Sequence, residues 1–440
     1  MRTTVCVAGD SILMKPMPEG YKDGEDLRAF IARGDARINN LEMVISDYDC
    51  HASTFCGGIW LTAEEARLDE ILSYGFNCFG FANNHTMDYS YGGLASTLAA
   101  LKLREVPVCG AGLSLSAASA PAVIESEHGT VAVFSITTTC DDAARAGDPK
   151  GRIPARPGLN MLRHTETFLL NEEHLNEIRK IAEITKINGR IDNSKRGGYT
   201  VSKPGIFSLG NIDFKLSDRE GKSSAPHPAD MLRMENAVKK ACAQYDYVIM
   251  CVHSHEIKGL LDEEPDYFLE TFARACIDWG VAAVIGSGTH QIKALELYRG
   301  KPIFYSIANF IFQSEGPSEL PADYFERYGI STDKTAQEAI LIRSDGGRRG
   351  LETEFKNYMG LLPLLTFEDG ELAAIEILPL ELNFAASDRD LKGLPRVADE
   401  KTAARIFATL SGLSRPLGTD MTLSDGRIFV RVGDVKCAGL

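Results

Sequence analysis

The chain reads FNCFGFANNHTMD at residues 76–88 and DYVIMCVHSHE at residues 246–256. In each stretch, a short run of apolar, β-branched or aromatic residues ends abruptly in Asn, His or Glu. The stretches TTVCVAGD (residues 3–10) and VAAVIGSGTH (residues 281–290) repeat this arrangement, and residues 131–136 and 303–307 form further runs of the same kind. Apolar runs of this length, bounded by Gly and Asn, are typical of buried strands.

Stretches with helical periodicity lie between these runs. They cover residues 62–73, 94–103, 230–244 and 267–279. Strand–helix alternation predicts a layered α/β domain. In such folds the carboxyl ends of the strands meet at one edge, so the polar residues that follow each strand are expected to converge on one site.

The pattern changes twice along the chain. Residues 140–228 are polar and less regular, which predicts an insertion over the active-site face, acting as a lid. After residue 320 the chain becomes rich in Pro, Gly and polar residues, and then shows a hairpin over residues 361–380, turning at Asp369-Gly370, and a helix over residues 398–411. We therefore expect a main domain over residues 1–320 and a C-terminal α+β appendage over residues 321–440.

Composition excludes several classes of function. The 440 residues carry a formal net charge of −14, which argues against binding of nucleic acid. The N-terminus lacks the long apolar run of a secretory signal, and no stretch is long enough for a transmembrane helix. The ten cysteines include no CxxC pair, which fits reduced, buried thiols. These features predict a cytoplasmic protein without a membrane span; a homo-oligomer is left open.

A cluster of metal-ligand residue types follows the predicted strands. Four of the nine histidines stand at strand ends, together with two carboxylates and an amide. The residues are Asp10, Glu42, Asn84, His85, His253, His255 and His290. Each taken singly fits a hydrogen-bonded structural residue, but seven at convergent strand ends favour a metal site over a polar network.

This mixture of ligands suits a particular chemistry. One or two divalent ions need carboxylates to balance their charge, neutral imidazoles and an amide oxygen. Mixed nitrogen and oxygen ligands admit Mn, Fe, Zn or Co. A water held by the ions loses a proton near neutral pH and becomes a nucleophile, and a histidine beside the ions can protonate the leaving group.

Five motifs, taken in order, resemble those of the poly-γ-glutamate capsule protein CapA family. They are Gly9-Asp10, Asn40-Leu41-Glu42, the stretch at residues 82–88, His253-Ser254-His255-Glu256, and residues 286–290 with the downstream stretch at residues 298–310. Further likeness lies at residues 156–163, 393–396 and 416–419, so the resemblance covers nearly the whole chain. That family is similar to calcineurin-like metallophosphoesterases, which implies a two-sheet α/β sandwich.

The resemblance also implies roles for individual residues. By it, Asp10, Glu42, Asn84, His253 and His290 hold the metal, and His85 is the general acid. His255 and Glu256 are either ligands or groups that orient His253. The family has a second histidine where this chain has Ser287, which implies one weaker metal position, with His255 as the nearest replacement donor. Classical capsule members also carry a membrane anchor, which this sequence does not show.

The remaining assignments concern the substrate and the acid. We assign Asn40, Arg156, Arg163 and Glu256 to substrate binding, because two arginines in a Pro-Gly loop suit a small-molecule or peptide-like anionic substrate. A surface ion-pair network explains the arginines equally well. Asp88 either orients His85, as a second catalytic residue, or caps the helix that starts near Gly92, and capping is the simpler interpretation.

Two classes of function follow. The first is a metallohydrolase that cleaves a phosphoester or an amide, including a γ-glutamyl-like amide, with a metal-bound hydroxide. The second is a non-catalytic capsule biosynthesis or scaffold protein that keeps the fold. The nearly complete ligand set favours the enzyme, and Ser287 favours the scaffold. The sequence does not choose between phosphoester and amide, because the same nucleophile serves both.

Overall fold

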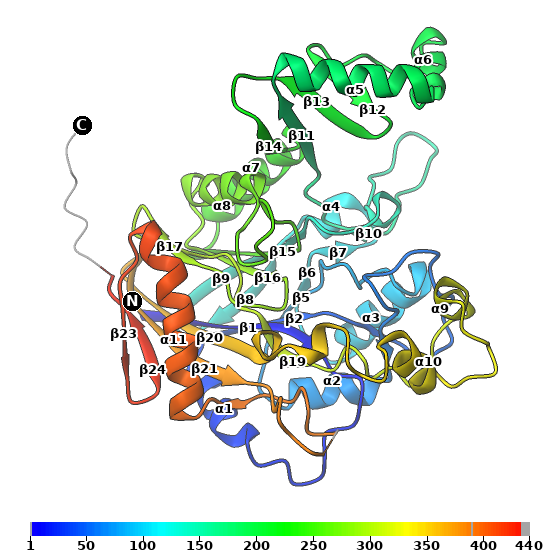
Figure 1. The fold of residues 1–440 in the computed structure, drawn as a ribbon. Helices are drawn as coiled ribbons and strands as arrows, with labels where there is room; N and C mark the ends of the chain where they lie inside the picture. Colours follow the sequence, from blue (N-terminus) through cyan, green and yellow to red (C-terminus); the bar gives the residue numbers. More distant parts are fainter. Residues whose placement is uncertain (1, 389, 433–440) are drawn as a thin grey trace, which may run out of the picture.

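The computed structural model describes residues 2–388 and 390–432. Its largest sheet is built around the N-terminal strand (Figure 1). In spatial order its strands are β23 (Met421–Ser424), β24 (Arg427–Val430), β21 (Glu371–Glu381), β20 (Met359–Glu368), β1 (Arg2–Ile12), β2 (Ala36–Leu41), β5 (Cys78–Gly80) and β6 (Val108–Cys109). β19 (Asn309–Phe312) also pairs with β1, and β22 (Arg396–Val397) with β21. β1 is parallel to β2 and β19 and antiparallel to β20.

A second sheet stacks on the first. Its strands are, in spatial order, β17 (Leu295–Tyr298), β18 (Lys301–Phe304), β16 (Ala283–Gly288), β15 (Tyr247–Ser254), β9 (Gly129–Thr137) and β8 (Ala122–Ser126). Val5 and Val7 of β1 lie in one buried apolar cluster with Val133, Ile249 and Ile285 of this sheet. Side chains alternate along a strand, so the intervening residues of β1 face the opposite side. The two sheets therefore share one core between them.

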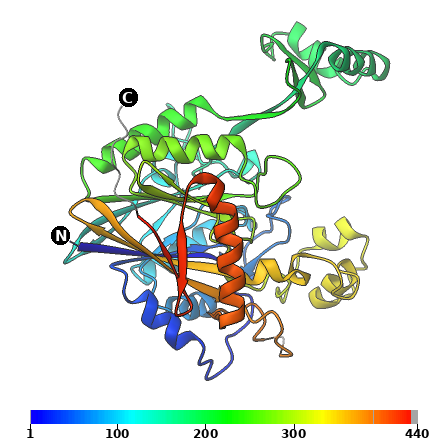
Figure 2. The same ribbon diagram turned by 60° about the vertical axis from the view of Figure 1, so that its left-hand side comes forward.

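Helices cover the outer faces. On the first sheet lie α1 (Gly24–Ile31), α2 (Glu65–Leu72) and α3 (Ser90–Leu103); on the second lie α7 (Pro228–Cys242) and α8 (Tyr267–Trp279). α11 (Glu400–Ser414) packs against β21 and β17 (Figure 2) and inserts Ile406 and Leu410 into the core between the sheets. Each fully buried Leu or Ile of this kind stabilises the fold by about 1.5–3 kcal/mol. The fold is thus mixed α/β, as the alternating pattern predicted.

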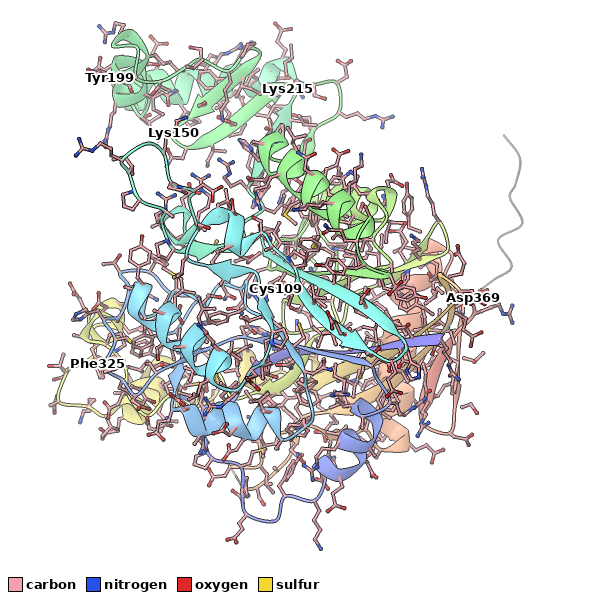
Figure 3. All side chains as sticks on the ribbon, turned by 180° about the vertical axis from the view of Figure 1, so that it is seen from behind. Cys109, Lys150, Tyr199, Lys215, Phe325 and Asp369 are labelled. Carbon is pink, nitrogen blue, oxygen red and sulfur yellow. The ribbon has the colours of Figure 1, made fainter. Side chains whose placement is uncertain are left out.

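The expected irregular insertion contains a small, regular unit of its own. Its sheet has the order β12 (Ile206–Leu209), β13 (Ile212–Leu216), β11 (His164–Leu170), β14 (Gly221–Pro226), and α5 (Glu172–Thr185) and α6 (Gly189–Arg196) accompany it. The unit projects from the body on β11 and β14 (Figures 1 and 2), and Figure 3 shows Tyr199 and Lys215 on it. Its role as a lid stays a prediction.

The C-terminal part continues the main sheet. The predicted hairpin is β20–β21, and its turn at Asp369 and Gly370 has positive φ at both residues (49° and 90°), as a tight hairpin turn requires. β20 pairs with β1 along Arg2–Cys6, so the sheet runs across the predicted boundary at residue 320. Residues 321–440 are therefore not an appendage in the sense of a separate sheet, and the division into two domains stays a prediction.

The main body also contains short strands and short helices. β3 (Val44–Ile45) pairs with β4 (Thr62–Ala63), β7 (Ala111–Gly112) pairs with β10 (Gly158–Leu159), and three short helices are α4 (Leu115–Ala118), α9 (Ala322–Tyr328) and α10 (Ala336–Arg343). The nine cysteines within residues 2–388 and 390–432 are free thiols; Cys437 lies outside the described residues. No helix in this part of the chain is both long enough and apolar enough to span a bilayer.

Candidate metal centre

The predicted strand ends converge. Asp10 of β1 lies opposite Asn40 of β2 and Asn309 of β19, and His253 of β15 lies opposite Ser287 of β16. Parallel strands present their carboxyl ends at one edge, so the polar residues that terminate them share one region of the molecule. The structure brings together the seven predicted residues Asp10, Glu42, Asn84, His85, His253, His255 and His290.

His253 stands at the middle of this cluster. Its Nε2 lies 2.7 Å from Asn84 Oδ1, 3.1 Å from His255 Nε2 and 3.4 Å from Glu42 Oε1. Its Nδ1 lies 3.6 Å from Asp10 Oδ1. Nitrogen and oxygen atoms of five residues, at or after the ends of four strands, therefore point at one another within a space the size of a metal coordination sphere.

Two sets of three residues could each hold an ion. Glu42, His253 and His255 form one set, and Asp10, Glu42 and His290 form the other, with the ligand atoms of each set within 4.8 Å of one another. Glu42 belongs to both sets. Its carboxylate could therefore contribute a ligand atom to an ion in either set.

Glu42 gives the clearest test of whether these residues fit a cation. Its side chain is completely buried, and within the described residues no N–H or O–H group donates to either carboxylate oxygen. Burial, together with the nearby charges of Asp10 and Asp88, raises its pKa well above the ordinary value. A buried carboxylate without a donor is unfavourable, and a divalent cation beside it removes that penalty. The residues present therefore fit a divalent metal.

Asp10 differs from Glu42 because N–H groups of the protein already donate hydrogen bonds to its carboxylate. Asn40 Nδ2 donates to its Oδ1 (2.7 Å), and the backbone N–H of Gly288 donates to its Oδ2 (2.9 Å). Burial acts to raise its pKa, but hydrogen bonding and the charges of His253 and His290 outweigh burial and hold the pKa below its ordinary value. Gly288 has a φ of 117°, which favours glycine at the position where this N–H must turn toward the carboxylate.

The imidazoles of His255 and His290 are held neutral, and the ring of His290 is also oriented. Burial lowers the pKa of His290 to about 4 and that of His255 well below its ordinary value, and neutral imidazole is the form that binds metal. His290 Nδ1 lies 2.8 Å from the side-chain oxygen Oδ1 of Asn309 and donates to it, which leaves Nε2 available. His290 also has a φ of 59°, an uncommon backbone conformation that the surrounding fold maintains. Sequence reasoning missed this orienting role of Asn309, which pairs with Asp10 across β1 and β19.

His85 forms a pair with Asp88. Its Nδ1 lies 2.7 Å from Asp88 Oδ2, and Asp88 also accepts hydrogen bonds from the backbone N–H groups of Gly57 (3.0 Å) and Leu61 (2.9 Å). α3 begins at Ser90, and Asp88 does not cap it. The interpretation of Asp88 as a helix cap is therefore wrong: the buried carboxylate binds His85 and fixes the ring with Nε2 directed away from Asp88.

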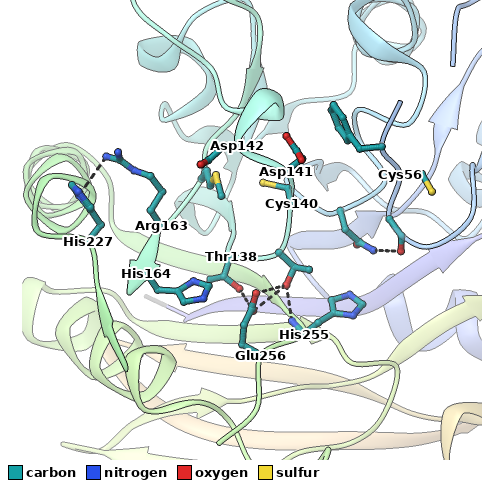
Figure 4. Close-up of a pocket in the computed structure, with 15 residues that line it drawn as sticks. Cys56, Thr138, Cys140, Asp141, Asp142, Arg163, His164, His227, His255 and Glu256 are labelled. Carbon is teal, nitrogen blue, oxygen red and sulfur yellow. Dashed lines mark hydrogen bonds between the residues drawn. The ribbon is translucent and has the colours of Figure 1, made fainter. Parts of the chain in front are cut away.

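A cavity of about 760 Å³ borders the cluster (Figure 4). Its lining includes Asn84, Thr138, Thr139, Cys140, Asp141, Asp142, Arg163, His164, His227, His255 and Glu256. Glu256 accepts hydrogen bonds from Thr139 Oγ1 (2.9 Å) and Ser254 Oγ (2.9 Å), so its carboxylate faces hydroxyl groups and lies outside both sets of candidate ligands. Thr138 and Thr139 could not be recognised from the sequence, where only their position after β9 sets them apart.

The two arginines have different positions. Arg163 lines the cavity, but its guanidinium already forms a bidentate pair with Asp230, with N–O distances of 2.8 and 3.0 Å. Arg156 is exposed, donates through Nε to the Arg145 carbonyl and is not among the residues that line the cavity. Asn40 and Ser287 instead flank His253, each 3.3 Å from its Nδ1. Roles of these residues in substrate binding stay predictions.

Comparison with known proteins identifies the relatives of this chain. Two proteins of Sinorhizobium fredii, both named as uncharacterized (y4sH and y4uA), are 28% identical over 445 aligned positions, which cover 98% of this chain and 93% of each relative. The PGA biosynthesis protein CapA of Bacillus subtilis is 23% identical over 256 positions, covering 58% of this chain and 47% of that protein. The family described as bacterial capsule synthesis protein PGA_cap matches residues 4–314. The chain therefore belongs to the PGA_cap family of bacterial capsule synthesis proteins.

Proposed function

We propose that this chain is a metal-dependent hydrolase that cleaves a phosphoester or an amide bond, including a γ-glutamyl-like amide, in a small anionic substrate. One observation carries the proposal: Glu42 is a fully buried carboxylate without a donor among the described residues, shared by two sets of candidate ligands beside a large cavity. A divalent ion, when bound there, would act as a Lewis acid and activate a water. The two-sheet layering is consistent with a metallophosphoesterase-like sandwich.

The side chains of the cluster would have two different roles, metal binding and proton transfer. Asp10, Glu42, Asn84, His253, His255 and His290 would hold one or two ions. His85, fixed through Nδ1 by Asp88, presents Nε2 as the atom that carries a proton to the leaving group. The buried Asp88 carboxylate accepts from Nδ1 and so holds the ring in this position. Binding of an anion would depend chiefly on the ion itself, because Arg163 is already paired with Asp230.

A second candidate is a capsule biosynthesis or scaffold protein that binds metal without turnover. It draws support from Ser287, where a neutral hydroxyl lies 3.3 Å from His253 Nδ1 in place of a further imidazole, and from the name of the Bacillus subtilis relative. This candidate shares the metal centre with the hydrolase but predicts no reaction. Cytoplasmic localisation stays a prediction for either.

One experiment separates the two candidates. Purified protein is stripped of metal with a chelator, reloaded separately with Mn, Fe, Zn or Co, and assayed against a panel of phosphomonoesters, phosphodiesters and γ-glutamyl amides. The hydrolase proposal predicts turnover of at least one substrate class that is lost on chelation and in the Glu42→Gln variant. Stoichiometric metal binding without turnover of any panel member favours the scaffold, and absence of metal binding contradicts both.

A further inference from the structure

A second cavity reaches the cluster from the side of His85. It has a volume of about 260 Å³, and His85 and His290 line it but do not line the larger cavity. Gly57 lines both cavities. A Cβ at Gly57 would come within 2.6 Å of Asn84 Nδ2 and 2.7 Å of His85 Cε1, so a glycine is needed where the chain passes over these two side chains. The metal centre thus lies between two chambers that meet at Gly57.

The outer wall of the second cavity comes from a segment beyond the part that matches the family. The family match ends at residue 314, whereas Glu315, Tyr324, Tyr328, Arg343 and Leu351 all line the cavity. They belong to α9, α10 and the adjoining loops, and Figure 3 shows Phe325 on this segment. Tyr324 and Phe325 pack in one buried cluster with Trp60 and Val44, so the segment is anchored to the loop that carries Gly57.

The lining of the second cavity is part apolar and part polar, and carries no excess charge. Ile12, Ile59, Leu351 and the rings of Tyr324 and Tyr328 form its apolar part, and the polar part includes His85, His290 and Ser314. The single arginine, Arg343, is paired with Glu315. The Tyr324 hydroxyl is buried and makes no hydrogen bond within the described residues, although Arg343 lies close enough to influence its pKa. A ligand here would be uncharged, with an apolar ring against Ile59, Leu351 and the tyrosine rings and a polar substituent to meet that hydroxyl.

His85 connects this cavity to the reaction. A general acid must lie within hydrogen-bonding reach of the atom that it protonates. If the proposed hydrolase function holds, the group released by bond cleavage leaves on the side of His85, toward the second cavity. We infer that the second cavity is the leaving-group subsite, and that the α9–α10 segment selects an uncharged, ring-sized alcohol or amine as the leaving group. The metal-bound, anionic part of the substrate then lies toward the larger cavity.

Two matched variants test this subsite. Leu351 lines it and is 49% exposed, while Ile342 of α10 is 54% exposed and does not line it. The larger side chain of Leu351→Trp should fill the cavity and should not disturb the core, because residue 351 is partly exposed. Ile342→Trp is the control. The probe is 4-fluorophenol, observed by fluorine NMR with the zinc-loaded, full-length protein. We expect the dissociation constant to rise by about tenfold or more in Leu351→Trp, equivalent to about 1.4 kcal/mol, and to change less than about twofold in Ile342→Trp.

The same variants carry a second readout. For a substrate pair that differs only in a phenyl or a methyl leaving group, Leu351→Trp should lower kcat/KM for the phenyl compound by about tenfold and leave the methyl compound within about twofold. Failure of every substrate to turn over would contradict the proposed function, while binding of 4-fluorophenol would still decide the subsite. Equal binding by wild type and Leu351→Trp, or no binding by wild type, would overturn the inference.

Discussion

Glu42→Gln is expected to stabilise the metal-free protein and to remove most of the stabilisation that metal binding supplies. In the metal-free protein the buried carboxylate has no donor among the described residues, and its pKa is raised by burial and by the charges of Asp10 and Asp88. The folded state therefore holds a proton that the unfolded state releases above about pH 4.3. The contribution of Glu42 to stability is therefore fully present below that pH, and it is lost as the pH rises through the raised pKa of Glu42 in the folded state. The glutamine cannot ionise, so the metal-free variant should unfold at a higher temperature than wild type at pH 8.

Metal binding favours the wild type. An ion at 100 times its dissociation constant stabilises the folded protein by about 2.7 kcal/mol. For 440 residues, an unfolding entropy of about 2.1 cal/mol/K per residue converts this into a rise in Tm of about 3 °C. Loss of the shared carboxylate, if it weakens binding about 100-fold, leaves a gain of about 0.4 kcal/mol and a rise below about 1 °C. Wild type should therefore gain about 3 °C on metal addition and the variant almost nothing.

Differential scanning calorimetry at pH 8, with chelator and then with zinc or manganese, measures both effects. Glu296→Gln is a suitable control, because Glu296 is also buried but accepts hydrogen bonds from Arg274 (3.0 Å) and Tyr305 (2.6 Å) away from the cluster. Glu296→Gln should lower Tm both with chelator and with metal, and it should leave the rise in Tm on metal addition unchanged. A metal-dependent rise in Glu42→Gln equal to that of wild type would refute the reasoning, as would a metal-free variant less stable than wild type.

Four further substitutions have definite outcomes. His85→Ala should leave metal content by elemental analysis nearly intact while lowering kcat by about 10²–10⁴-fold; loss of metal together with activity would make His85 a ligand instead. His255→Ala should lower the metal content per chain and Ser287→His should raise it, and equal content in wild type and both variants would show that neither position contributes. Asp230→Asn should cost about 1–3 kcal/mol in urea unfolding at pH 7. Although burial opposes it, pairing with Arg163 lowers the pKa of Asp230, so this difference should shrink as the pH falls below about 4; a difference that is constant with pH would contradict the pairing argument.

Local patterns in the sequence predicted the strands and the place where they end. Length, β-branched content and the abrupt change to Asn, His or Glu are properties of a few adjacent residues, and parallel strands then bring those ends together by geometry alone. The turn at Asp369-Gly370 is local in the same way, because two positive φ values demand such residues. For these reasons residues as distant as Asp10 and His290 could be assigned to one cluster before the structure was known.

The pairing of segments that are distant along the chain could not be predicted, because it leaves no local pattern in the sequence. Nothing in residues 359–368 indicates that β20 pairs with β1 rather than with a separate sheet, since either partner would bury the same apolar face. The strands of the projecting unit are mostly half-buried or exposed, so they lack the apolar runs that mark buried strands. Arg163 illustrates the same limit for side chains, because its partner Asp230 lies 67 positions away and neutralises the charge that suggested an anion-binding role.

Anomalous X-ray scattering from crystals of the manganese-loaded protein decides whether Glu42 lies beside a divalent ion. We expect an anomalous peak within about 2.0–2.4 Å of a Glu42 carboxylate oxygen and of donor atoms from His253 and His255, or from Asp10 and His290, with two peaks if both sets are filled. Crystals soaked at saturating manganese that show ordered Glu42, His253 and His290 side chains and no anomalous peak among them would contradict this expectation.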